Sequence, residues 1–184
     1  MNKLTIPVFI IIVLAQLFVP GQMIWQKEMA LVKGKEFRFE TAPVDPSNPF
    51  KGKYIHLDFK SNSYYSSDSH YVNQEELYVE LGVNKQGFAE IRKVSREKPI
   101  TGTDYVLAKA DYIETIGNDQ KVRIDYPFSE YYMNEYNASK AEELYRSSNR
   151  DTVKKTFAIV KVFNGKAVIR DIIINGRSID DWFK

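Results

Sequence analysis

A serine and two lysines lie close together in a polar segment, and these residue types can form a catalytic dyad. Ser47 is followed by Lys51 and Lys53. A lysine activates a serine only when the two are within hydrogen-bond reach and burial lowers the lysine pKa. The composition of this segment is typical of an exposed turn, so it does not indicate the burial that a Ser47–Lys53 pair would need.

Two histidines suggest a second chemistry, the binding of a metal ion. His56 and His70 are accompanied by Asp58 and Asp68, and imidazole and carboxylate groups are common zinc ligands. The histidines occur in different sequence contexts without a tight ligand spacing, so we interpret them as structural and expect no metal or other cofactor. His56 shares one face of an expected strand with Tyr54 and Asp58, which makes it the best candidate for a polar site.

Glutamates in the C-terminal third could supply two carboxyl groups for glycoside hydrolysis: Glu130, Glu135, Glu142 and Glu143. Such an enzyme needs two carboxyl groups roughly 5 to 9 Å apart across a cleft. We place Glu142 in a helix capping box and expect the others to face water. We therefore assign no catalytic residue, and we keep an envelope hydrolase using Glu135 and His56, or the Ser47–Lys53 pair, as the alternative.

Tyrosines form two clusters that suit recognition better than catalysis: Tyr64, Tyr65 and Tyr71, and Tyr131, Tyr132 and Tyr136. An exposed aromatic ring with a polar tip contributes large contact area at a protein or glycan interface. The competing interpretation is that these rings pack along strands. Asn134 and Glu135, beside the second cluster, could orient a ligand or cap the following helix.

The bulk composition excludes several classes of function. The 184 residues carry a net charge of +2, which does not favour a nucleic-acid surface. The absence of cysteine removes thiol nucleophiles, Cys-ligated zinc and disulfides, and is compatible with any compartment. The 12 tyrosines and 11 phenylalanines favour strands and binding surfaces.

Residues 4–19 are almost wholly apolar, and the segment continues through Pro20 and Gly21 to Trp25. A segment of about 20 such residues can cross the hydrocarbon core of a membrane, and Trp25 is well placed as an interfacial anchor. The short tail before it favours a signal anchor that translocates the C-terminal part. The alternatives are a cleaved signal peptide, although no small-residue cleavage site follows, and a buried core helix. We expect residues 26–34 to continue the helix as a stalk that ends at Gly34.

A stiff, proline-rich loop over residues 43–52 leads into a strand over residues 54–59. In that strand Ile55, Leu57 and Phe59 are expected to face one way and Tyr54, His56 and Asp58 the other. Residues 61–70 are rich in serine and tyrosine, and we expect a loop there.

Three pairs of alternating segments predict β-hairpins, with turns at 84–87, 117–119 and 164–165. Asn137 is the expected N-cap of a helix with a capping box over residues 139–142, and the C-terminal residues 179–183 are expected to dock as a short helix. The predicted fold is mainly β (α+β), an antiparallel sheet domain with one internal helix behind an N-terminal transmembrane helix.

The segment Gly52-Lys53-Tyr54-Ile55-His56-Leu57-Asp58-Phe59 resembles the signature of the GDYXXLXY family, with Lys53 in place of the family Asp and Phe59 in place of the final Tyr. The lead-in 43–46, the aromatic-Pro-Glu segment 126–135 and the closing hairpin with Ile169-Arg170 also fit. The resemblance implies a membrane-tethered, extracytoplasmic β domain that commonly accompanies a multi-helix integral membrane protein. It implies no established reaction.

We therefore expect a transmembrane anchor over residues 1–25, a helical stalk over 26–34 and an extracytoplasmic β domain over 35–184. The expected function is a membrane-anchored binding or assembly module of the bacterial envelope, in the periplasm, that partners an integral membrane protein and binds no nucleic acid. Its candidate contact surface comprises Asp45, Gly52, Tyr54, His56, Leu57, Tyr132, Asn134 and Glu135.

Overall fold

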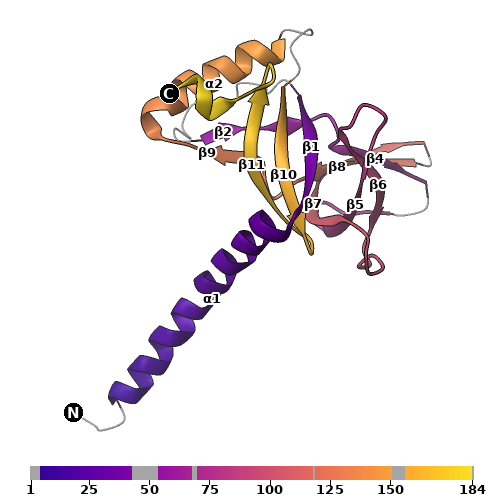
Figure 1. Cartoon of the computed structure of the whole chain (residues 1–184). Coiled ribbons are helices and arrows are strands. Elements are labelled where there is room, and N and C mark those ends of the chain that lie inside the picture. The colour runs from indigo at the N-terminus through magenta and orange to yellow at the C-terminus, as the bar shows by residue number, and fades with distance from the viewer. Residues whose placement is uncertain (1–4, 43–53, 68–69, 118, 151–155, 184) are drawn as a thin grey trace.

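The N-terminal apolar residues form one continuous helix, α1 (Thr5–Lys33), in the computed structural model of the chain. The structure describes residues 5–42, 54–67, 70–117, 119–150 and 156–183. The helix projects from the strands (Figure 1), and its most apolar window has a mean hydropathy of 2.1 with none of that window buried. It is therefore long and apolar enough to span a membrane, and its exposure is inconsistent with a buried core helix.

The last turns of α1 pack on two strands of the domain, β10 (Thr156–Phe163) and β11 (Lys166–Ile174). Ala30 is fully buried there, and the Gly34 N–H donates to the Ala30 carbonyl oxygen at 2.9 Å. A Cβ on Gly34 would lie 2.1 Å from that oxygen, so the junction requires glycine. The helix ends where predicted and passes into β1 (Lys35–Ala42) without a flexible linker.

The first sheet is antiparallel, in the order β12-β11-β10-β1-β3, with β12 at Arg177–Ser178 and β3 at Asp58–Phe59. The predicted hairpin between β10 and β11 is confirmed. Its turn residues Asn164 and Gly165 have φ of 48° and 80°. This is the left-handed pair that a two-residue hairpin turn needs.

The second sheet has the order β4-β8-β7-β5-β6, formed by β4 (Ser63–Ser66), β5 (Glu76–Val83), β6 (Ala89–Ser95), β7 (Tyr105–Ile116) and β8 (Asp119–Asp125). The predicted hairpins β5–β6 and β7–β8 are both confirmed. The tip of the β10–β11 hairpin joins the two sheets, because the Leu107 N–H donates to the Gly165 carbonyl oxygen at 2.9 Å. A Cβ on Gly165 would lie only 2.7 Å from the Tyr105 ring, so this close contact favours glycine at the hairpin tip.

Aromatic residues fill the core between the sheets. The Phe39 ring makes edge contacts with Phe59, Tyr126 and Phe128 at centroid distances of 5.3, 5.4 and 5.1 Å. Ile55, Leu57 and Phe59 are all buried, as the alternating pattern predicted. Burial of these large apolar side chains is the main favourable contribution to folding.

Two strand predictions need correction. Residues 61–70 are not all loop, because β4 forms within them and pairs with β8 at the sheet edge. The expected strand 54–59 divides at Leu57 into β2 (Tyr54–His56) and β3, which pair with β9 (Glu130–Tyr132) and β1 respectively. The Leu57 N–H donates to the Ser129 carbonyl oxygen at 2.8 Å between the two ladders.

The internal helix, α2 (Glu135–Arg150), begins earlier than predicted. The Tyr136 N–H donates to Asn134 Oδ1 at 3.1 Å, so Asn134 is the N-cap. The predicted cap at Asn137 and the capping box at 139–142 are therefore wrong, because these residues lie inside the helix. The C-terminal residues form a short 3₁₀ helix, η1 (Ile179–Trp182), docked through buried Ile179.

Candidate functional site

A two-stranded ladder brings together the two segments that the sequence placed on one surface. In the β2–β9 pair, Tyr54 lies opposite Tyr132, Ile55 opposite Tyr131, and His56 opposite Glu130. Alternation along a strand puts the first and third of these pairs on one face and the middle pair on the other. The register thus makes Tyr54, His56 and Tyr132 backbone neighbours in one ladder, whereas their role in binding remains a prediction.

The two faces of the ladder differ in exposure. Tyr131 and Ile55 face the core, and the Tyr131 hydroxyl donates to Asp180 Oδ2 at 3.2 Å. Burial raises the pKa of the Tyr131 phenol, and nearby carboxylates raise it further. Tyr132 is 69% exposed, and its hydroxyl donates to Glu130 Oε2 at 2.7 Å. This hydrogen bond raises the pKa of Tyr132 and holds the ring on the outer face.

The remaining residues of the predicted surface have different positions. Leu57 is a core residue rather than a surface residue. The Asn134 side chain is used as the cap of α2. Tyr54 and Glu135 occupy the first positions of β2 and α2. Asp45 and Gly52 lie outside the described part of the chain, and so do Ser47, Lys51, Lys53 and Asp68 of the alternative sites.

His56 borders a polar cavity of about 220 Å³ that is also lined by Asp58, Asp111, Arg123 and Asp125. Arg123 Nη2 donates to Asp58 Oδ2 at 3.0 Å, and its Nε lies 3.8 Å from Asp111 Oδ2. Loss of hydration and the Asp111 charge raise the pKa of Asp125, while His56 and two nearby cations oppose the shift. This cavity therefore brings one histidine, one arginine and three carboxyl groups together.

Sequence reasoning identified His56 but missed the other side of this polar cavity. The β7–β8 register places Arg123 opposite Tyr112 and Asp125 opposite Lys109. The hairpin pattern in the sequence could have placed Arg123 and Asp125 on one strand face, since they are two residues apart. Nothing in the sequence indicated that this face lies beside His56.

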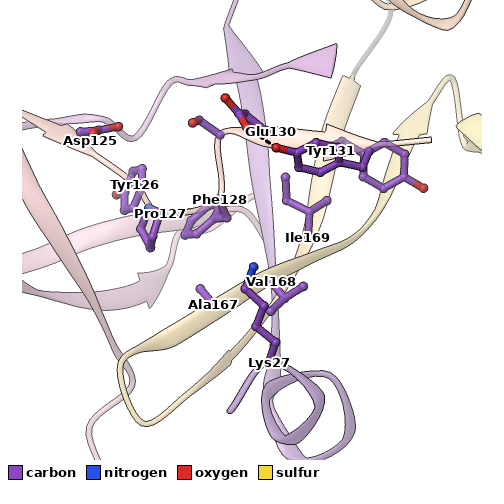
Figure 2. Close-up of a pocket in the computed structure, with 12 residues that line it drawn as sticks. Lys27, Asp125, Tyr126, Pro127, Phe128, Glu130, Tyr131, Ala167, Val168 and Ile169 are labelled. Atoms are coloured by element: carbon purple, nitrogen blue, oxygen red, sulfur yellow. Dashed lines mark hydrogen bonds between the residues drawn. The ribbon is translucent and has the colours of Figure 1, made fainter. Parts of the chain in front are cut away.

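A larger cavity of about 510 Å³ lies between the base of α1, β11 and the segment 125–132. Figure 2 shows Lys27 reaching into it from the helix, with Asp125 and Glu130 on the opposite side. A second cavity of about 400 Å³ adjoins it and shares Lys27, Asp125, Pro127 and Ala167. No pattern in the sequence indicated this site, because its walls come from three distant segments.

Metal binding receives no support in the described residues, which contain no group of three or more histidines or acidic residues able to hold an ion.

The comparison with known proteins gives one family and no individual relative. No curated protein and no solved structure matches the chain. A family model described as GDYXXLXY protein matches residues 16–172, which include α1 from Gln16 onward and nearly all of the β domain. The chain therefore belongs to the GDYXXLXY family.

Proposed function

We propose that this protein is a membrane-anchored, extracytoplasmic module of the bacterial envelope that assembles with an integral membrane protein. The observation that carries the proposal is the exposed apolar surface of α1, which runs from Ile6 to Trp25 and is fixed to the domain through Gly34. A helix with this surface requires lipid or other membrane helices around it. The extracytoplasmic side of the domain is what the resemblance to the GDYXXLXY family implies.

The exposed tyrosines at the β9–α2 corner supply the proposed contact surface for the partner. Tyr132 is 69% exposed and Tyr136 is 89% exposed, and they lie on the two sides of the α2 cap. Aromatic rings with polar tips are enriched at protein interfaces and dominate their binding energy. The assembly role of this corner is consistent with the integral membrane protein that commonly accompanies the family.

Crosslinking and affinity capture from native membranes test this proposal. The variant Tyr132→Ala/Tyr136→Ala is compared with wild type and with Tyr65→Ala/Tyr112→Ala, which removes two tyrosines of similar exposure from the second sheet. Circular dichroism first establishes that both variants are folded. We expect wild type and the control variant to capture one integral membrane protein, and the corner variant to lose it. Equal capture by all three would exclude this corner, and no specific capture would exclude an assembly role.

The alternative is an envelope hydrolase, and the polar cavity beside His56 is the observation that favours it. His56, several acidic residues and Ser129 all line this cavity. However, no hydrogen bond joins Ser129 to His56 in the described chain, so the activated pair that a nucleophile needs is not formed. A peptidase and glycosidase screen of wild type and His56→Ala would support this alternative only if activity is present and depends on His56.

A further inference from the structure

The position of α1 in the proposed membrane span defines the depth of the cavities at its base. A binding site in these cavities therefore depends on the proposed membrane anchoring. Residues 5–25 rise about 30 Å along the helix axis, at roughly 1.5 Å per residue. This matches the hydrocarbon thickness of about 30 Å. Lys27 is two residues further, so its Cα lies about 3 Å beyond the hydrocarbon edge. It is therefore within a headgroup layer of roughly 5 to 7 Å per leaflet.

The β domain extends over the helix at this depth. Lys27 lines both cavities, together with Ala167 from β11 and Pro127 from the segment after β8. Figure 2 shows Lys27 beside Ala167 and Val168, with Phe128 and Ile169 forming the apolar wall above them. A lipid headgroup next to α1 would thus find a walled site rather than a flat surface.

In the larger cavity, the charged residues of the walls have opposite signs on opposite sides, with Lys27 facing Asp125 and Glu130. The Lys27 amine makes no hydrogen bond or ion pair with any residue that the structure describes. Across the cavity, the Asp125 carboxylate likewise accepts no hydrogen bond in the described chain. The Glu130 carboxylate is on the same side as Asp125. A ligand that fits this arrangement carries a negative group near Lys27 and a hydrogen-bonding cation near the two carboxylates.

We propose that the cavity binds the headgroup of a zwitterionic aminophospholipid, with its phosphate at Lys27 and its primary ammonium at Asp125 and Glu130. The Tyr132 hydroxyl already donates to Glu130 at 2.7 Å and orients that carboxylate. Choline headgroups bind less well because a quaternary ammonium has no N–H to donate. Anionic headgroups bind less well because they face two carboxylates.

Native mass spectrometry of the full chain in detergent tests this proposal, with equimolar phosphatidylethanolamine, phosphatidylcholine and phosphatidylglycerol as probes. Lys27→Gln and Asp125→Asn are compared with two controls of the same chemistry. Lys33→Gln changes an exposed lysine on the same helix, and Asp119→Asn changes an exposed aspartate on the same strand. Neither control residue lines either cavity.

We expect wild type and both controls to retain phosphatidylethanolamine in preference to the other two lipids. Each cavity variant should reduce that retention by about tenfold, as expected for the loss of one charged hydrogen bond. Equal retention of all three lipids, or retention unchanged in both cavity variants, would overturn the site. A preference for phosphatidylglycerol that only Lys27→Gln removes would overturn the zwitterionic assignment.

Two further measurements distinguish the headgroup site from membrane insertion and from assembly with the partner. Soluble glycerophosphoethanolamine carries the same phosphodiester and ammonium groups without acyl chains, and its binding with equal strength would overturn a lipid as the ligand. Flotation of the chain with phosphatidylcholine vesicles reports membrane insertion without the site, and partner capture reports assembly. A chain that floats and captures its partner but retains no phosphatidylethanolamine would refute only the headgroup site.

Discussion

Arg96 illustrates how single side chains fix the surface segments of this domain. Its guanidinium donates to the Glu75 carboxylate and, at 2.5 Å, to the carbonyl oxygen of His70. It also lies over the Tyr71 ring, 5.3 Å from the centroid. These contacts tie the segment before β5 to the end of β6. The hydrogen bond from Arg96 lowers the pKa of Glu75 below its ordinary value of 4.5.

The lowered pKa predicts a pH-dependent stability contribution from Glu75. A carboxyl with a depressed folded-state pKa stabilises the fold above its unfolded pKa, and this stabilisation is lost as the pH falls through the folded pKa. Because the pair is exposed, we expect Glu75→Gln to lower the melting temperature at pH 7 by no more than about 3 °C. The difference from wild type should shrink below pH 4.5, as thermal melts at pH 7 and pH 3 would reveal.

Glu90→Gln is the matched control for this experiment, since Glu90 is exposed on β6 and makes no ion pair in the described chain. We expect it to behave as wild type at both pH values. A Glu75→Gln deficit of equal size at pH 7 and pH 3 would mean that the carboxylate charge is not the source of the stability.

At the scale of elements, the hairpins could be predicted because their signals are local. Asn164, Gly165 and Gly87 have left-handed backbone conformations, and asparagine and glycine are residue types that adopt this conformation readily. Strand β4 could not be predicted in this way. Its serines favour a loop, and it is a strand only because β8 offers a partner edge. The division of 54–59 at Leu57 likewise depends on two different partner strands.

The candidate site likewise contains some features that local patterns predict and others that depend on long-range packing. The exposure of His56 next to buried Ile55 followed from strand alternation, and the exposure of Tyr132 is consistent with its aromatic cluster. The placement of Asp125 beside the same cavity as His56, and of Lys27 across the larger cavity from Asp125, is set by how the helix and two sheets pack. Long-range packing of this kind has no signature in a single segment.

The start of α2 gives an element-scale prediction, because the sequence and the structure assign its cap to different residues. We expect Asn134→Ala to lower the free energy of unfolding by about 1 kcal/mol, the usual loss for an N-cap side chain. Asn137→Ala should have a smaller effect, since alanine is the better helix former inside a helix. Thermal melts of the two variants in the same detergent measure this difference. A larger loss for Asn137→Ala would restore the cap predicted from the sequence.

For the whole molecule, the junction at Gly34 determines how far the domain can be from the membrane. Helix α1 continues for eight residues beyond the proposed span, 26–33, and then enters β1 directly. Its last turns pack on β10 and β11. If α1 spans a membrane as proposed, this packing holds the domain close to the headgroups in a fixed orientation. That arrangement favours both a partner within the membrane and a lipid site at the helix base.

Membrane anchoring by α1 predicts different outcomes for the same substitution at two positions on the helix. Leu14 and Val32 are 62% and 77% exposed, but only Leu14 lies within the proposed span. A lysine near the centre of a spanning helix opposes insertion by about 3 kcal/mol, whereas one beyond the membrane edge has little effect. We expect Leu14→Lys to move a large part of the protein from the carbonate-resistant membrane fraction to the supernatant, and Val32→Lys to fractionate as wild type. Intact mass distinguishes the remaining alternative, because a cleaved signal peptide would give a shortened wild-type chain that is already in the supernatant.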